Sequence, residues 1–337
     1  MKGRDLLILA AVVLIGGLAV ADSLRPEGEP EPVAEERATT ATTATTTTPQ
    51  PNEDLGRESF PAVPGAGGGL VLTQAGSCAV REFDLPTGLE FRNVVSRSTC
   101  ELWAAPVTAK VAVGIAEPIG DAVPFRFIDL ARPGRNLGTS EALFGFLVWS
   151  PDGQRAAWCN RRRMAVDLDV GRRRRLLPEC PATYTLENEV AFAVGDRLVV
   201  EDGTVLTASG GITAVNTGAD GSFGVIVEGR RIERYEGGEL TDAFDLGERF
   251  EGRLPVLSPD NCSAVFRVGD RVQLFDVGCS RFGASGPLFP GHVATWSPDG
   301  RWLAVGGATD LTFYDLEGRR DPVQWEVGVV EIAWRRS

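Results

Sequence analysis

The chain has 337 residues, of which 24% are charged, and its formal net charge is −12. Such an acidic chain lacks the concentrated cations that nucleic-acid binding requires, so we expect no nucleic-acid partner. The single histidine, His292, excludes metal sites built from several imidazoles, and any histidine-dependent catalysis would have to use that residue. We therefore predict no metal, no cofactor and no catalytic residue.

Residues 1–22 are predicted to form a hydrophobic helix. Lys2 and Arg4 precede an apolar run that extends from Leu6 to Ala21. This pattern fits a cleaved secretory signal, or a signal anchor that stays in the membrane with its positive end in the cytoplasm. Both interpretations place the remaining chain outside the cytoplasm. We favour the anchor, and hence a single-pass protein of the cell membrane, with secretion as the alternative, because a stalk-like segment follows.

Residues 23–67 have the composition of a disordered linker. An acidic, proline-bearing stretch is followed by threonine and alanine from Thr39 to Thr48, and then by more proline and glycine. Such a segment cannot bury enough apolar surface to offset the entropy lost on ordering. A flexible chain of about 45 residues has a reach of about 35 to 40 Å, which would hold a domain clear of a membrane.

Residues 68–337 show the pattern of an all-β domain. Short runs of Val, Phe, Leu and Ile are separated by Gly, Asp-Gly or Pro, with no helical spacing. The stretch Trp296-Ser-Pro-Asp-Gly300 predicts a tight hairpin turn, since proline fixes φ, aspartate bonds its own backbone and glycine accepts positive φ. The same five residues recur at 149–153, and a weaker copy stands at 257–261.

A second recurring feature, an acidic residue, allows the repeats to be counted. An acidic residue stands near the end of each predicted third strand, with a mean spacing of about 38 residues, and follows an apolar residue in all copies except the fourth, where it follows Glu201. Its seven copies are Asp84, Asp129, Asp167, Asp202, Glu236, Asp276 and Asp315. A regular period of this length is typical of repeat architectures that bury a shared core. The spacing predicts seven four-stranded units.

The motif Trp-Ser-Pro-Asp-Gly, followed by an apolar strand and then by Tyr-Asp-Leu, resembles the WD-like repeats of TolB-type β-propellers. The resemblance implies a seven-bladed β-propeller, but little about activity, because this fold hosts many functions. The first unit lacks its tryptophan-bearing strand, whereas the C-terminus carries an extra one, Val329 to Ser337, with Trp334. We expect this last strand to complete the first blade and close the ring.

The six cysteines fit this propeller frame. Sequence alone allows fifteen pairings, and placement on the blades favours three bonds within blades: Cys78 with Cys100, Cys159 with Cys180, and Cys262 with Cys279. The first two pairs would lie on one face. We call this the top face, and it is formed by the turns between second and third strands and by the connections between blades.

Few residues are candidates for catalysis or ligand binding. Arg161, Arg162 and Arg163 in a top-face turn, together with His292 before the first strand of the last blade, are the candidate binding residues. We predict a monomeric, extracytoplasmic, membrane-tethered module that binds an envelope protein or a ligand without catalysis. A propeller-type lyase or hydrolase with a site at a channel mouth is one alternative. The sensing domain of a membrane complex is another.

Overall fold

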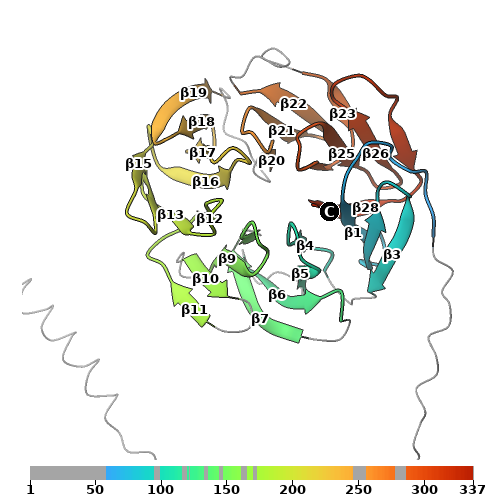
Figure 1. The fold of residues 1–337 in the computed structure, drawn as a ribbon, viewed down its shortest axis with the longest axis horizontal. Helices are drawn as coiled ribbons and strands as arrows, with labels where there is room; N and C mark the ends of the chain where they lie inside the picture. Colours follow the sequence, from blue (N-terminus) through green and yellow to red (C-terminus); the bar gives the residue numbers. More distant parts are fainter. Residues whose placement is uncertain are drawn as a thin grey trace, which may run out of the picture. The chain divides into compact units, whose positions relative to one another are not determined.

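The computed structural model describes residues 58–94, 99–115, 120, 122–132, 136–143, 147–160, 165–169, 173–245, 256–277 and 286–336. All regular elements in this part of the chain are β-strands. The strands form seven four-stranded antiparallel sheets, which are arranged in a ring (Figure 1). The fold is a β-propeller.

Six of the sheets are blades whose four strands follow one another in the chain. The strands of the first three are β4 (Leu102–Ala104), β5 (Lys110–Gly114), β6 (Ala122–Asp129), β7 (Asn136–Leu143); β8 (Leu147–Trp149), β9 (Arg155–Cys159), β10 (Ala165–Asp169), β11 (Arg173–Leu176); and β12 (Ala182–Tyr184), β13 (Val190–Val194), β14 (Arg197–Val200), β15 (Val205–Thr207). The others are β16 (Ile212–Thr217), β17 (Phe223–Val227), β18 (Arg231–Glu236), β19 (Glu239–Asp245); β20 (Val256–Leu257), β21 (Ser263–Val268), β22 (Arg271–Asp276), β23 (Leu288–Pro290); and β24 (Val293–Trp296), β25 (Trp302–Gly306), β26 (Leu311–Asp315), β27 (Val323–Trp325).

The remaining sheet is assembled from strands at both ends of the described chain. Its order is β28-β1-β2-β3, and its strands are β1 (Gly69–Gln74), β2 (Val80–Asp84), β3 (Leu89–Val94) and β28 (Val329–Arg335). Trp334 of β28 lies directly opposite Leu70 of β1 in an antiparallel pair. The last strand thus completes the first sheet, as predicted. This pairing covers an edge of β1 that would otherwise be open to other chains.

The predicted fold class needs two corrections. The sequence predicts a seven-bladed propeller, whereas only six blades consist of consecutive strands and the other sheet is split between the two ends of the described chain. The prediction also includes an N-terminal helix, whereas no helix occurs among the described residues. Residues 1–22 lie outside that part of the chain. Among the described residues, no helix has the length and apolar character needed to span a membrane.

The Ser-Pro-Asp-Gly stretches form the turns between the first and second strands of their blades, which we call first turns. In one of them the Ser150 hydroxyl lies 2.5 Å from the Asp152 carboxylate. The glycines that end the two full copies, Gly153 and Gly300, have φ of 65° and 70°. Asn261 replaces this glycine in the weaker copy and adopts φ of 55°, since asparagine tolerates the left-handed region better than most side chains. The local rule inferred from the sequence therefore holds in all three copies.

Apolar side chains pack between neighbouring sheets rather than in one central core. Where the composite sheet meets the last blade, Leu70, Phe83, Trp302, Phe313 and Trp325 are fully buried in one cluster. The channel side of each sheet consists of its innermost strand. This arrangement leaves the centre of the ring available for a site.

Residues 58–67, which the sequence analysis places in the linker, pack against the ring. The Phe60 ring stacks on Trp325 with 4.9 Å between centroids, and the Trp334 indole donates a hydrogen bond of 2.9 Å to the Gly67 carbonyl. The segment therefore crosses the boundary between the last blade and the composite sheet. The composition of residues 58–67 does not reveal this packing, because the segment is held by two aromatic contacts although most of its residues are typical of a linker.

Replacing Phe60 with alanine is expected to lower the free energy of unfolding by about 2 kcal/mol, because a partly buried ring and its aromatic contacts are lost. Urea denaturation would measure the change. The matched control is Phe91→Ala on β3, whose ring is 60% exposed and should cost much less. Equal losses from the two variants would mean that residues 58–67 do not stabilise the ring.

Candidate functional site

The candidate site is the central channel. The innermost strand of every sheet, β4, β8, β12, β16, β20, β24 or β28, lies at one end of its sheet. Residues from all seven strands line a cavity of about 500 Å³, which is within the usual size of small-molecule sites. Each innermost strand pairs on one side only, so its other edge offers backbone N–H and C=O groups to the channel.

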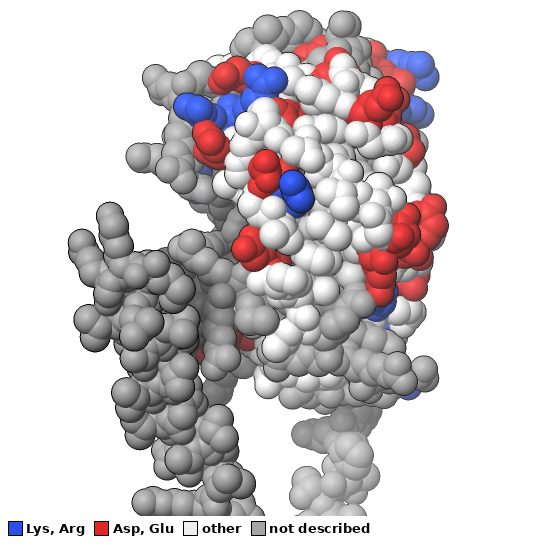
Figure 2. Space-filling view, turned by 90° about the vertical axis from the view of Figure 1, so that its left-hand side faces the viewer, with Lys and Arg blue, Asp and Glu red and all other residues white. Residues whose placement is uncertain are grey.

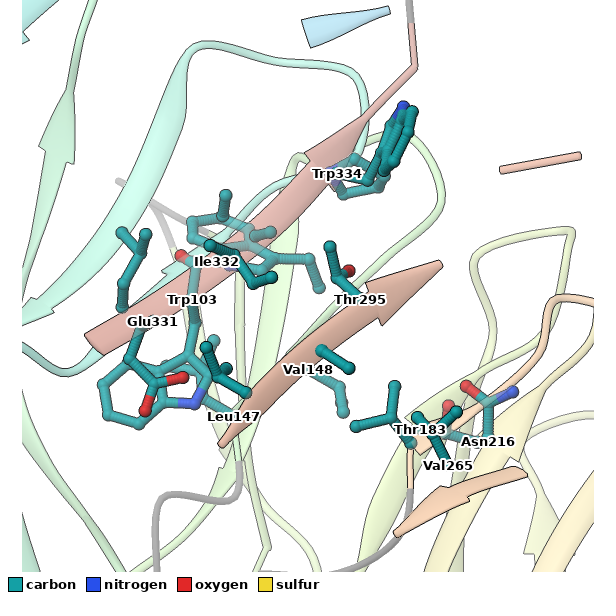
Figure 3. Close-up of a pocket in the computed structure, with 18 of the residues that line it drawn as sticks. Trp103, Leu147, Val148, Thr183, Asn216, Val265, Thr295, Glu331, Ile332 and Trp334 are labelled. Atoms are coloured by element: carbon teal, nitrogen blue, oxygen red, sulfur yellow. Dashed lines mark hydrogen bonds between the residues drawn. The ribbon is translucent and has the colours of Figure 1, made fainter. Parts of the chain in front are cut away.

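The wall of the cavity is largely uncharged. Apolar side chains from four strands surround it, and three uncharged polar side chains stand among them (Figure 3): Trp103, Leu147, Val148, Val265, Ile332 and Trp334, with Thr183, Asn216 and Thr295. The hydroxyls of Thr183 and Thr217 lie 3.4 Å apart, across two blades. The Asn216 amide donates to the Asn261 side chain at 2.8 Å, which fixes its orientation. Such a wall suits a ligand without formal charge.

Ionisable residues from three sheets also line the cavity. Arg267 comes from β21, His292 immediately precedes β24, Glu331 lies on β28, and Arg336 follows β28. Glu331 is 8% exposed. The sequence analysis named only His292 of these four. The other predicted binding residues, Arg161 to Arg163, lie outside the described residues.

The recurring tryptophans have a packing role as well as a place in the wall. The indole N–H of Trp149 donates to the Trp103 carbonyl, and that of Trp296 to the Val256 carbonyl, each at 3.1 Å and each across a blade boundary. These bonds agree with the interpretation of the repeat position as blade packing. The sequence did not predict that Trp103, Trp149 and Trp334 would also line the channel.

Two of the predicted disulfides are present. Cys78 is bonded to Cys100, and Cys159 to Cys180. Cys262 is disulfide-bonded as well, but its predicted partner, Cys279, lies outside the described residues, so that pairing stays a prediction. Disulfides persist in oxidising compartments. They therefore indicate an extracytoplasmic environment.

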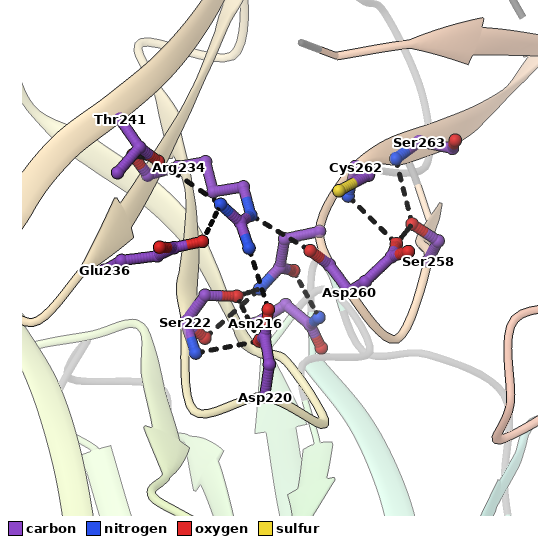
Figure 4. A network of polar contacts seen from close by, with 11 residues as sticks. Asn216, Asp220, Ser222, Arg234, Glu236, Thr241, Ser258, Asp260, Cys262 and Ser263 are labelled. Carbon is purple, nitrogen blue, oxygen red and sulfur yellow. Dashed lines mark hydrogen bonds and ion pairs between the residues drawn. The ribbon is translucent and has the colours of Figure 1, made fainter. Parts of the chain in front are cut away.

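A buried arginine fastens two neighbouring blades at their first turns (Figure 4). The Arg234 side chain, 9% exposed, forms an ion pair of 2.7 Å with Asp220 and donates from Nε to the Asp260 carbonyl at 3.0 Å. It also pairs with Glu236. Burial alone would raise the pKa of Asp220, but hydrogen bonds from Ser222 and Arg234 hold it below its usual value. These contacts give the cluster a structural role between blades.

The same cluster removes a potential modification site. Asn261-Cys262-Ser263 matches the sequence of an N-glycosylation acceptor. The Asn261 side chain is fully buried and donates 2.9 Å to the Ser222 hydroxyl. An acceptor asparagine must be accessible, so the folded protein does not present this one.

The buried carboxylate of Glu233, on β18, accepts a hydrogen bond of 3.1 Å from the Ser209 N–H, in the connection from the preceding blade. Burial by itself raises its pKa, but hydrogen bonds from Ser209, Tyr235 and Arg231 outweigh that effect and hold the pKa below its usual value. The Tyr235 hydroxyl donates at 2.6 Å and Arg231 Nε at 2.8 Å. Burial, together with the bond to Glu233, raises the pKa of Tyr235.

These contacts predict an acid-sensitive contribution to stability from Glu233. A pKa that is lower in the folded state favours folding at neutral pH, and this contribution is lost as the pH falls from about 4.5 through the folded-state value. Urea denaturation of the wild type and of Glu233→Gln should show a difference in unfolding free energy that shrinks between pH 7 and pH 3. A difference that stays constant with pH would contradict the assignment.

Charge is dispersed over the outer surface. Figure 2 shows acidic and basic side chains in small groups on the described part of one side of the ring, with uncharged areas between them. Exposed arginines of the described chain can be paired locally, as Arg230 is with Glu228 at 3.0 Å. This side therefore offers no continuous basic patch in the part described.

No family model and no curated protein matches the chain. Among solved structures, it is similar to the β-propeller domain of Myceliophteria thermophila Cps50 (Swd1), with 14% identity and a TM-score of 0.51 over 74% of this chain and 96% of that one. A functionally unknown protein from Desulfotomaculum acetoxidans has 14% identity and a TM-score of 0.48 over 80% of this chain and 99% of that one. At this identity the likeness to the Cps50 domain supports the β-propeller fold alone.

Proposed function

We propose that the protein is an extracytoplasmic β-propeller module, related in its repeats to the TolB-type propellers, that binds a protein partner or ligand. Residues 1–22 hold it at the cell membrane as a single-pass anchor. The observation that carries the proposal is the channel of about 500 Å³, because residues from every sheet line it and its wall is mainly uncharged. The disulfide-bonded cysteines support the placement outside the cytoplasm.

Photo-crosslinking of the full chain in its cell envelope tests the binding role. A crosslinking residue is placed at position 292, which lines the channel, and another at exposed Leu240 on β19 as the control. We expect a defined partner or ligand to be captured from position 292 and not from position 240. Capture at neither position, together with a panel of top-face variants that changes nothing, would defeat the proposal.

N-terminal sequencing of the mature protein tests the anchor. An intact start within residues 1–5 is expected for a retained membrane anchor. A start near residue 22 would show that the segment is a cleaved signal and that the protein is secreted.

One observation favours a second candidate function, a lyase or hydrolase. Arg267, His292 and Glu331 come from three sheets and line the same cavity, and convergence of this kind can supply acid–base groups to a substrate. Assays of the full chain on panels of ester, glycoside and uronide substrates would reveal such an activity. Turnover that His292→Ala abolishes would support the enzyme, and absence of turnover across the panels would favour the binding module.

A further inference from the structure

Hydrogen bonds join neighbouring first turns, on the face opposite the top face, at four boundaries between sheets. Their contacts run from one blade to the next around much of the channel opening. The Thr108 hydroxyl donates 3.2 Å to the Gly153 carbonyl, the Asp152 N–H donates 3.0 Å to the Asn188 side chain, and the Arg336 N–H donates 2.6 Å to the Pro106 carbonyl. The Ala219 N–H also donates to the Pro259 carbonyl. We call this opening the first-turn mouth. A rim fixed in this way loses little conformational entropy when a ligand binds.

Apolar side chains are exposed at the first-turn mouth. Leu186 is 37% exposed and Val256 is 40% exposed, and both also line the cavity. Pro106 and Pro151 stand beside them, and the rings of Trp149 and Trp334 continue the apolar surface inward. Exposed apolar groups around a concave opening mark interaction sites more often than isolated ones do. The top side of the same cavity carries Arg267 and His292 instead.

Carboxylates surround this apolar opening. Asp152, Glu187 and Asp299 are exposed on first turns, as is Asp220, whose carboxylate is already paired with Arg234. Two arginines at the ends of these turns are already engaged, because Arg155 donates 2.7 Å to the Asn188 carbonyl and Arg301 pairs with Asp315 at 2.8 Å. Arg336, which follows β28, is exposed at the same opening, where the carboxylates of Asp152, Glu187 and Asp299 outnumber it. The rim therefore favours a partner with positive charge next to its apolar part.

We propose that the first-turn mouth docks a partner peptide whose uncharged apolar tip enters the channel and whose flanking lysines or arginines face the rim. The tip meets the aromatic wall, and its main chain runs along the channel-facing edges of the innermost strands, as an extended peptide does when it adds to a sheet. The proposal rests on the binding role proposed above and specifies the mouth and the partner chemistry. It assigns docking to the face opposite the one that the sequence analysis favours.

Selection from a random dodecapeptide library displayed on phage tests the partner chemistry, with the oxidised full chain in detergent as the target. We expect enriched peptides to combine a short uncharged apolar run with adjacent Lys or Arg. Leu186→Glu should weaken their binding at least about tenfold, since it places a charge in the apolar opening. The matched control, Leu240→Glu on β19, also replaces an exposed leucine, here 50% exposed, and should change binding by less than about twofold.

A second pair of variants tests the role of the rim. Asp152→Asn and Glu187→Gln should each weaken the enriched peptides and reduce the dependence of their affinity on salt, because exposed charge pairs are screened by ions. Enrichment of acidic peptides, no enrichment, or equal effects of Leu186→Glu and Leu240→Glu would overturn the proposal. A partner crosslinked at position 292 that still binds the Leu186→Glu chain would overturn the docking mouth alone and leave the binding role standing.

Discussion

Removal of residues 329–337 is expected to abolish the folded monomer. The deletion takes away β28, and with it the buried side chains of Val329, Ile332 and Trp334. At about 2 kcal/mol for each buried apolar side chain, the loss is about 6 kcal/mol before any hydrogen bonds are counted, which is comparable to the whole stability of a typical domain. The deletion also exposes the edge of β1, so aggregation should accompany unfolding.

Size-exclusion chromatography and circular dichroism of the truncated chain would measure this outcome. The control is removal of residues 336 and 337 alone, which leaves β28 intact and should preserve a cooperative unfolding transition. Adding a synthetic peptide of residues 329–337 to the longer truncation should restore part of the folded population. A truncated chain that remains monomeric and unfolds cooperatively would show that β28 is not needed to close the ring.

Loss of the bond between Cys159 and Cys180 is expected to lower the free energy of unfolding by about 3 kcal/mol, because the crosslink restricts the unfolded chain. The paired Cys159→Ser and Cys180→Ser variant should therefore unfold at a lower urea concentration than the oxidised wild type. The bond between Cys78 and Cys100 closes a loop of similar length, 22 against 21 residues, and should have a similar effect.

The control for this experiment is the reduced wild-type protein. A reducing agent should lower the stability of the wild type more than that of the variant, which has already lost one crosslink. An identical urea midpoint for the oxidised wild type and the variant would mean that the native packing around Cys159, which is 5% exposed, makes the bond redundant.

The architecture was predictable where local chemistry repeats. The turn residues at 149–153 and 296–300 have narrow backbone requirements, so their recurrence identified the hairpins, and Trp334 identified the closing strand. The sheet split between the chain ends was foreseen for the same reason. Composition misassigned residues 58–67, where Val63 is fully buried, because a few apolar anchors do not change the average of a proline- and glycine-rich stretch.

The channel wall was much less predictable. Thr183, Asn216 and Glu331 meet in one cavity only because the ring closes, and no spacing in the chain gives their distance. His292 was recognised because it is the single histidine. The available signal was position in the repeat, because the last residues of the first strand, just before the first turn, line the cavity in several blades. That signal becomes specific only after the blades are counted.

The packing of residues 58–67 also determines where mechanical load would enter the ring. The main-chain N–H groups of Phe60 and Val63 donate to the carbonyls of Gly88 and Leu85, beside β3 and β2, while Phe60 stacks on Trp325 of the last blade. A force applied to the chain before residue 58 would therefore load the contacts of residues 58–67 before it loads the hydrogen bonds between β1 and β28. Tension applied at residue 58 would be shared by two sheets, and the closing strand would be shielded from it.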